Sequence, residues 1–122
     1  ERITTSFPYW FCANLRKYAG KESELPVDQH ELIALIAPRA VYVASADEDL
    51  WADPRGEYGS LLAARPVFRL FGKEGMTEKA MPALGEPRRV GSMGYHIRTG
   101  GHGLEDRDWG WFLDFADGQL KR

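Results

Sequence analysis

The spacing of hydrophobic and polar side chains changes several times along the chain and predicts alternating helices and strands. Residues 40–45 are apolar almost throughout, which is typical of a strand that is covered on both faces of a parallel sheet. Residues 90–98, where Tyr95 and Ile97 alternate with their neighbours, predict a second strand. A helical pattern follows each strand, so the order strand, loop, helix occurs twice.

Two helices are predicted before the first strand. In residues 7–19 the apolar side chains recur at helical intervals, and Gly20 ends the pattern. Asp28 and Glu31 have the spacing of a capping box, in which two side chains accept hydrogen bonds from backbone amides at the start of a helix. A second helix is therefore expected after Asp28, and Pro38 stops it.

A third helix is predicted after the first strand. Asp53 and Pro54 are preferred residue types for the N-cap and the first helical position, and the helix is expected to end near Arg65. The pattern leaves open whether residues 67–71, beyond Pro66, continue this helix or form a strand.

The last third of the chain is expected to hold a long connection, the second strand and a final helix. Residues 76–89 contain glycine, proline and charged residues, and predict the connection. Asp106 or Asp108 is expected to cap the final helix. The apolar face predicted for this helix consists of Trp109, Phe112, Leu113, Ala116 and Leu120.

This succession predicts an α/β fold with a doubly wound, mainly parallel sheet and flanking helices. In such sheets functional residues lie at the carboxyl ends of the strands. The loops that follow residues 45 and 98 both leave carboxyl ends. With 122 residues, of which 43% are hydrophobic, the chain has material for one modest core, so residues 1–122 are expected to form part of a single domain.

Charge and composition exclude several classes of function. The net charge of −2 and the scattered basic residues give no reason to expect nucleic acid or an anionic membrane as a partner. No apolar run reaches the roughly 18 residues that a membrane span needs. Cys12 is the single cysteine, so no disulfide forms within the chain.

The two loops at the strand ends contain the residue types of a serine hydrolase. In an α/β-hydrolase the nucleophile, the acid and the histidine follow one another in that order along the chain. His102 follows two glycines, which permit a tight turn, and is the candidate base; the alternative is an ordinary surface histidine. His30 and His96 lie within predicted elements and are expected to be hydrogen-bonded polar groups.

Four acidic residues compete for the role of the acid: Asp47, Glu48, Asp49 and Asp53. Asp53 is already assigned to the helix N-cap and Asp47 lies close to the strand end, so Asp49 is the preferred candidate. A solvated turn or a cation site is the alternative, but the loop has no known metal-binding spacing. No metal or other cofactor is therefore expected.

A nucleophile is missing from this chain. None of its five serines lies in a G-x-S-x-G elbow or a similar turn: Ser6, Ser23, Ser45, Ser60 and Ser92. We therefore expect the chain to be the last part of a serine hydrolase, with the nucleophile-bearing part absent.

Five segments carry a family resemblance, in the same order and with similar spacing: residues 7–11 (FPYWF), 25–30 (LPVDQH), 37–39 (APR), 49–54 (DLWADP) and 94–102 (GYHIRTGGH). Together they resemble the bacterial glucuronoyl esterases of carbohydrate esterase family 15. The resemblance implies the C-terminal portion of an α/β-hydrolase. It also implies metal-independent serine esterase chemistry on 4-O-methyl-glucuronoyl esters that join lignin to xylan.

The resemblance assigns roles to three residues. His102 corresponds to the base, Asp49 to the acid of many bacterial members, and Trp51 to a tryptophan that packs on the uronate. Some members use an acid from an earlier strand instead. The nucleophile, a basic residue beside it and a sugar-binding Gln/Glu pair would all precede Glu1, so the remainder of the hydrolase domain is an expected partner. The family also implies glucuronoxylan or a lignin-carbohydrate ester as substrate, and a secreted or periplasmic location.

Two other readings stay open at this point. In the first, the parent enzyme is an acetyl xylan esterase or another α/β-hydrolase. In the second, these residues are a catalytically inert fragment that only packs or binds.

Overall fold

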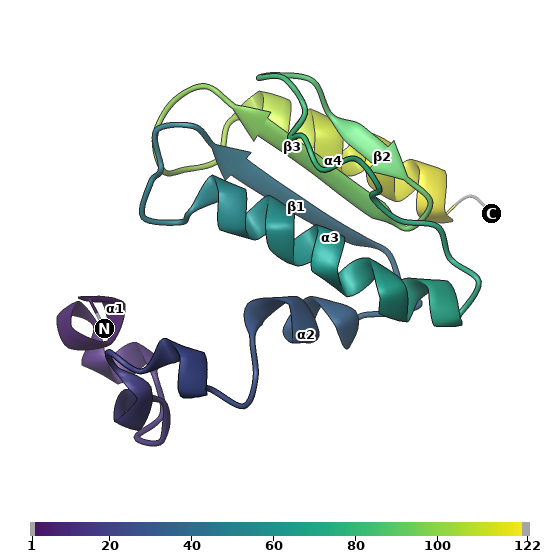
Figure 1. Ribbon diagram of the computed structural model, residues 1–122. Coiled ribbons are helices and arrows are strands. Elements are labelled where there is room, and N and C mark those ends of the chain that lie inside the picture. The colour runs from purple at the N-terminus through teal and green to yellow at the C-terminus, as the bar shows by residue number, and fades with distance from the viewer. Residues whose placement is uncertain (1, 121–122) are drawn as a thin grey trace.

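A three-stranded mixed sheet is the centre of the computed structural model, which describes residues 2–120 (Figure 1). Strands β1 (Val41–Ala46) and β3 (Met93–Arg98) are parallel, and β2 (Arg88–Val90) pairs antiparallel with β3, giving the order β1-β3-β2. The register pairs Val41 with Met93 and Ala46 with Arg98. The carboxyl ends of the two predicted strands therefore lie side by side.

One helix covers each face of this sheet. Helix α3 (Pro54–Leu70) packs on the face that carries Tyr95 and Ile97, where the buried side chains form the hydrophobic core. Helix α4 (Asp106–Leu120) packs on the other face, where Tyr42 lies edge-on to the ring of Phe115 at a centroid distance of 5.1 Å. The expected α/β class is confirmed, although a mixed three-stranded sheet does not by itself establish a doubly wound fold.

Helix α3 begins as predicted and ends later. Asp53 adopts φ 55° and accepts a hydrogen bond of 3.1 Å from the amide of Gly56. The helix continues through Pro66 to Leu70, so the boundary expected near Arg65 is wrong. Phe68 is fully buried in the core. The free energy gained from this burial offsets the cost of the backbone hydrogen bond that a proline removes from a helix.

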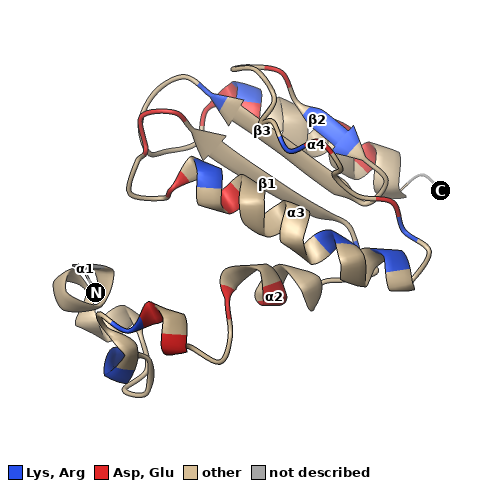
Figure 2. Ribbon diagram, in the orientation of Figure 1, with Lys and Arg blue, Asp and Glu red and all other residues tan. Residues whose placement is uncertain are grey.

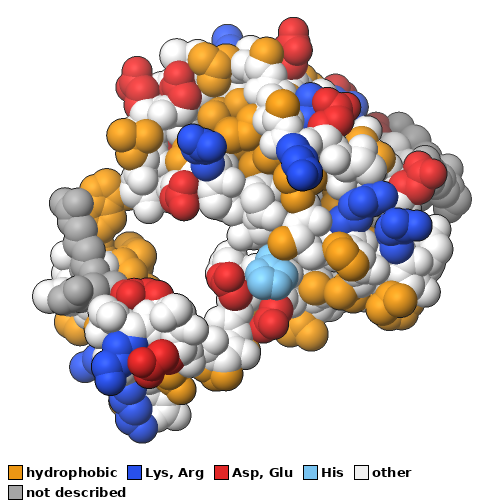
Figure 3. Space-filling model, in the orientation of Figure 1, with side chains coloured by type: hydrophobic (Ala, Val, Ile, Leu, Met, Phe, Trp, Pro, Cys, Tyr) orange, Lys and Arg blue, Asp and Glu red, His pale blue; other side chains and the backbone are white. Residues whose placement is uncertain are grey.

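The N-terminal region forms short helical segments that lie away from the sheet: α1 (Arg2–Ser6), the 3-10 turns η1 (Pro8–Trp10), η2 (Leu15–Tyr18) and η3 (Glu22–Glu24), and α2 (Gln29–Ala34). The capping box is confirmed, with Asp28 accepting from the amide of Gln29 at 2.6 Å and Glu31 accepting from the amide of Asp28 at 3.3 Å. Helix α2 packs against α3. An opening lies between the segments before α2 and the body of the molecule (Figure 3), and the two parts meet where Phe7 contacts Trp51.

The prediction of a single helix over residues 7–19 is wrong. The turns η1 and η2 contain no buried residue, so no apolar face is packed that would stabilise a continuous helix. The second strand also begins later than expected. Gly91, at φ 57°, separates β2 from β3, and a Cβ there would collide with the carbonyl of Glu74. Residues 90–98 thus hold the end of β2, a tight turn at residues 91–92 and then β3.

The buried face of α4 differs from the prediction. The helix begins at Asp106, so Asp106 and Asp108 both lie inside its first turn and neither is at the N-cap position expected for them. Its buried residues are Asp108 and Phe115. Trp109 and Leu113, placed on the apolar face by the sequence pattern, are 54% and 64% exposed. The pattern fails because a buried charged residue, Asp108, occupies a position that amphipathicity assigns to the solvent side.

None of the helices in the described part of the chain is both long and apolar enough to cross a membrane.

Candidate active site

The loops that leave β1 and β3 are joined by backbone hydrogen bonds. We call residues 47–53 the acid loop and residues 99–105 the histidine loop. The amide of Asp47 donates to the backbone carbonyl of Arg98 at 2.9 Å, and the amide of Glu48 donates to the carbonyl of Gly100 at 3.0 Å. In return, the amide of Gly100 donates to Oδ1 of Asp47 at 2.8 Å. Figure 2 shows the acid loop as a negatively charged turn at the end of β1.

This connection brings together the two residues that the sequence singled out. Nδ1 of His102 lies 2.7 Å from Oδ2 of Asp49. The histidine side chain is 91% exposed and the carboxylate 15%. If Nδ1 carries the proton and donates it to Asp49, Nε2 is left as the proton acceptor. The pair can therefore take a proton from a hydroxyl group that approaches the exposed side of the ring.

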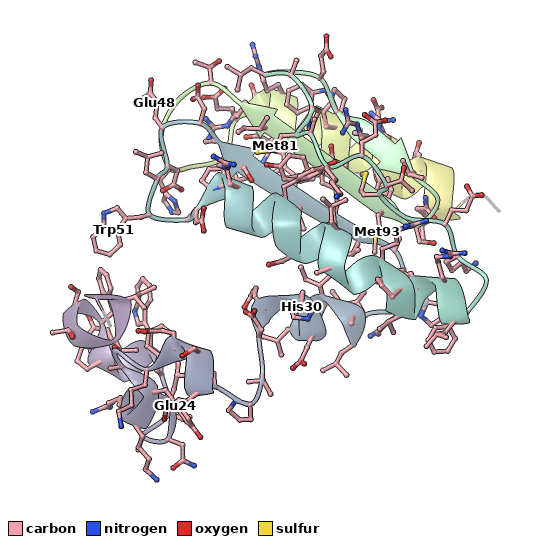
Figure 4. The ribbon with its side chains drawn as sticks, viewed as in Figure 1. Glu24, His30, Glu48, Trp51, Met81 and Met93 are labelled. Carbon is pink, nitrogen blue, oxygen red and sulfur yellow. The ribbon has the colours of Figure 1, made fainter. Side chains whose placement is uncertain are left out.

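The competing acids of the acid loop have other positions or partners. Asp47 accepts from Gly100, and Asp53 caps α3. Glu48 is exposed, and its side chain extends away from the loop (Figure 4). Asp49 is thus the acid that the loop presents to His102.

Glycine is required at one of the two positions before His102. Gly100 has φ 111°, a region that favours glycine, whereas Gly101 has neither a positive φ nor a neighbour within 4 Å of an added Cβ. Gly103, after the histidine, also has a positive φ of 144°. These two glycines allow the chain to turn sharply on both sides of the imidazole.

A cavity of about 390 Å³ opens beside the pair, and its lining includes Asp49, His102, Glu57 and Ser45. Ser45 donates to Glu57 at 2.6 Å and accepts from the hydroxyl of Tyr95 at 2.9 Å. Burial raises the pKa of Glu57 above its ordinary value of 4.5, and the nearby charge of Asp49 adds to the effect. Ser45 is 7% exposed and engaged by two partners, which does not suit a nucleophile.

The prediction that the other histidines are hydrogen-bonded polar groups is confirmed for His96. His96 is fully buried, with Nε2 at 2.8 Å from Asp108 and Nδ1 at 3.1 Å from the hydroxyl of Tyr42. Burial lowers the pKa of His96 below its ordinary value of 6.5, although Asp108 opposes this. A neutral ring that donates from Nε2 and accepts from Tyr42 satisfies both contacts. His30 is partly exposed, and its Nδ1 lies 3.7 Å from Oδ2 of Asp28, which is longer than a hydrogen bond.

An aromatic group lies next to the acid loop. Trp51 is 55% exposed and extends towards the N-terminal segments (Figure 4). Its ring contacts Phe7 edge-on at a centroid distance of 6.1 Å, and Phe7 stacks on Trp10 at 4.2 Å. This position, two residues after Asp49, gives a flat apolar surface close to the candidate base.

Sequence reasoning missed Arg98, which is 3% exposed and donates hydrogen bonds to the histidine loop. Its strand position offered a signal, because Arg98 alternates with Ile97 and so shares a face with His96. Among residues 2–120 no group of three or more His, Cys, Asp or Glu side chains is arranged to hold a metal ion.

Known protein families and solved structures include relatives of this chain. The family described as "Glucuronyl esterase, fungi" has a sequence model that matches residues 1–72. The chain belongs to the glucuronyl esterase family. The solved glucuronoyl esterase from Solibacter usitatus is 48% identical to this chain, with a TM-score of 0.88 over 97% of this chain and 30% of the solved one.

Two curated relatives extend the comparison. Carbohydrate esterase MZ0003, from an unknown prokaryotic organism, is 48% identical over 119 residues, which are 96% of this chain and 27% of the relative. The 4-O-methyl-glucuronoyl methylesterase 1 of Wolfiporia cocos is 38% identical over 63 residues, which are 52% of this chain and 15% of the relative. The chain thus spans less than a third of the length of each of these three relatives.

Proposed function

We propose that residues 1–122 are the C-terminal part of the α/β-hydrolase domain of a glucuronoyl esterase and supply the acid and the histidine of its catalytic triad. The observation that carries this proposal is the 2.7 Å contact between Nδ1 of His102 and Oδ2 of Asp49. Both residues follow carboxyl ends of adjacent parallel strands, which is where α/β folds hold their sites.

The reaction is acyl transfer in two steps. Nε2 of His102 accepts the proton of a serine hydroxyl that the rest of the hydrolase domain contributes, while the serine oxygen attacks the ester carbonyl. Collapse of the tetrahedral intermediate breaks the bond to the alcohol, which leaves with the proton from His102. Water, deprotonated by His102, then attacks the acyl-enzyme and releases the uronic acid and the serine. Asp49 holds the ring orientation and stabilises the imidazolium in both steps.

The proposed substrate is a 4-O-methyl-glucuronoyl ester of a lignin-carbohydrate complex or of glucuronoxylan. The methylesterase activity named for the Wolfiporia cocos relative supports this acyl group. Trp51 supports it chemically, because an exposed indole offers a flat face on which the apolar side of a sugar ring can pack. Polymers of this kind do not cross membranes, which supports a secreted or periplasmic location.

The test uses the full-length protein that contains these residues, assayed with methyl and benzyl esters of 4-O-methyl-glucuronate. Wild type is expected to hydrolyse these esters, and His102→Ala to lower kcat by at least about 1,000-fold with the fold retained. His30→Ala, at a partly exposed histidine outside the site, is the matched control and is expected to stay within about twofold.

Three outcomes would refute the proposal. Full activity of His102→Ala would remove the histidine from the mechanism. Preference for acetylated xylan, or for peptide substrates, would replace the glucuronoyl ester as substrate. An inactive full-length protein would favour an inert packing role.

A further inference from the structure

A buried arginine lies beneath the histidine loop and binds it from both sides of the imidazole. Nη2 of Arg98 donates to the carbonyl of Gly101 at 3.1 Å and to that of Gly103 at 2.7 Å, the two residues that flank His102. Nη1 donates to the carbonyl of Thr99 at 3.1 Å. One guanidinium therefore contacts three carbonyl groups of a seven-residue loop.

The arginine is itself fixed by a carboxylate from the opposite layer. Nε of Arg98 lies 2.9 Å from Oδ2 of Asp108, the buried residue in the first turn of α4. Oδ1 of Asp108 accepts from His96 at 2.8 Å, and Oδ2 also accepts from the amide of Glu105 at 2.8 Å. Both oxygens are thus engaged, so the buried charges compensate one another with defined geometry.

The histidine loop needs such a support because its own side chains give it little. His102 is 91% exposed, so packing does not fix the ring. Gly100 and Gly103 give the surrounding backbone a wide conformational range. The acid loop holds the backbone at Gly100, whose amide donates to Asp47 and whose carbonyl accepts from Glu48. Beyond Gly100 it contacts the histidine loop through the side chain of Asp49.

We propose that Arg98 is a positioning residue, which acts by holding the carbonyls around His102 so that its ring meets Asp49 and the serine in reactive geometry, with Asp108 as the group that orients the guanidinium. This rests on the proposed function of His102. Arg98 contacts backbone carbonyls and not reacting atoms, so its effect is on orientation. Arginine suits this task better than lysine, since its planar fork presents donors in several fixed directions at once.

The test compares arginine variants in the full-length protein. Arg98→Met is expected to lower kcat by about 100-fold or more with KM changed by less than about threefold, because misplacement of a catalytic group by about 1 Å has effects of this size. Arg98→Lys is expected to recover part of kcat, since an ammonium can still reach some of the carbonyls. Arg89→Met is the matched control, because Arg89 is also a sheet arginine paired with an aspartate of α4, Asp114, at 3.3 Å.

Active-site titration with a serine-directed phosphonate separates rate from the amount of folded enzyme. The inference predicts that kcat per titrated site falls in Arg98→Met and stays within about twofold in Arg89→Met. If Arg98→Met does not fold, Arg98→Lys and Asp108→Asn take its place, with Asp114→Asn as the control for the aspartate. Arg98→Lys and Asp108→Asn are then each expected to lower kcat per titrated site by about tenfold.

The outcomes distinguish this inference from the function on which it rests. If His102→Ala is inactive but the Arg98 and Asp108 variants keep wild-type kcat per titrated site, the positioning role is refuted and the function stands. A loss confined to KM would also refute it. If His102→Ala keeps its activity, the proposed function itself fails.

Discussion

His102 and Asp49 are 53 positions apart in the chain, yet Nδ1 of the histidine lies 2.7 Å from Oδ2 of the aspartate. The imidazole is 91% exposed and the carboxylate 15%, so the contact with Asp49, and not packing, holds the ring. The carboxylate should therefore determine the tautomer and the orientation of the imidazole.

Asp49→Asn is expected to lower kcat on a glucuronate ester by about 100-fold to 10,000-fold, because an amide can present its N–H to Nδ1 and favour the wrong tautomer. Glu48→Gln, at the exposed neighbouring acid, is the control and is expected to have almost no effect. Steady-state kinetics of both variants checks this. Equal activity of the two would mean that another acid supports His102.

Trp51→Ala is expected to lower kcat/KM on glucuronate esters by roughly 3- to 10-fold, as loss of an aromatic packing partner costs about 0.5–1.5 kcal/mol. Trp51→Phe should retain most of the efficiency. Trp109→Ala is the control, since Trp109 is 54% exposed on α4 against 55% for Trp51. Comparable losses in the two alanine variants would contradict a sugar-binding role for Trp51.

Gly94→Ala is expected to destabilise the sheet. The ring of Tyr42 lies directly on Gly94, and a Cβ at this position would collide with it. Overpacking of this kind costs about 1–3 kcal/mol, which should appear as a lower melting temperature in thermal unfolding. Gly110→Ala is the comparison, because nothing lies within 4 Å of its added Cβ and alanine favours helix. That variant should be neutral or more stable, and a similar loss in both would contradict the packing argument.

Stability is expected to fall as the pH drops below about 6.5, the ordinary pKa of histidine. Burial lowers the pKa of folded His96, so the unfolded chain binds a proton that the folded protein excludes. The contribution is complete above the unfolded pKa and is lost as pH falls towards the folded pKa, with a slope of up to about 1.4 kcal/mol per pH unit.

The measurement is the melting temperature between pH 8 and pH 5 for wild type, His96→Gln and His30→Gln. His96→Gln should show a smaller decrease, because glutamine keeps an N–H for Asp108 but does not titrate. His30→Gln should follow wild type. Asp108 adds a separate loss at lower pH: burial alone would raise its pKa, but hydrogen bonds from Glu105, Arg98 and His96 bring it below 3.8.

Local signals in the sequence predicted the elements that depend on neighbouring residues. The capping box at Asp28 and the N-cap at Asp53 are both present, because each needs only a side chain and amides up to three residues away. The apolar run after residue 40 also became β1, because burial on both faces of the sheet leaves its mark in the residue types of the strand itself. Elements whose limits depend on distant partners were placed less well.

Tertiary packing explains the errors. Helix α3 continues past Pro66 because Phe68 packs in the core. Helix α4 buries Asp108 because Arg98 and His96 hydrogen-bond its carboxylate. A charged residue is assigned to solvent when its partner is unknown. The role of Arg98 could not be predicted for the same reason, since its partners were unknown. The approach of the acid loop to the histidine loop could be predicted, because parallel strands end at the same edge of a sheet.

The direct pairing of β1 with β3 limits which changes in length this region can tolerate. Deleting one residue from either strand would shift its loop by about 3.3 Å and reverse the face of each following strand side chain, separating the acid from the imidazole. Insertions in the connection between α3 and β2 do not change the pairing of β1 with β3. Natural length variation among homologues should therefore occur in that connection and be absent from the two strands.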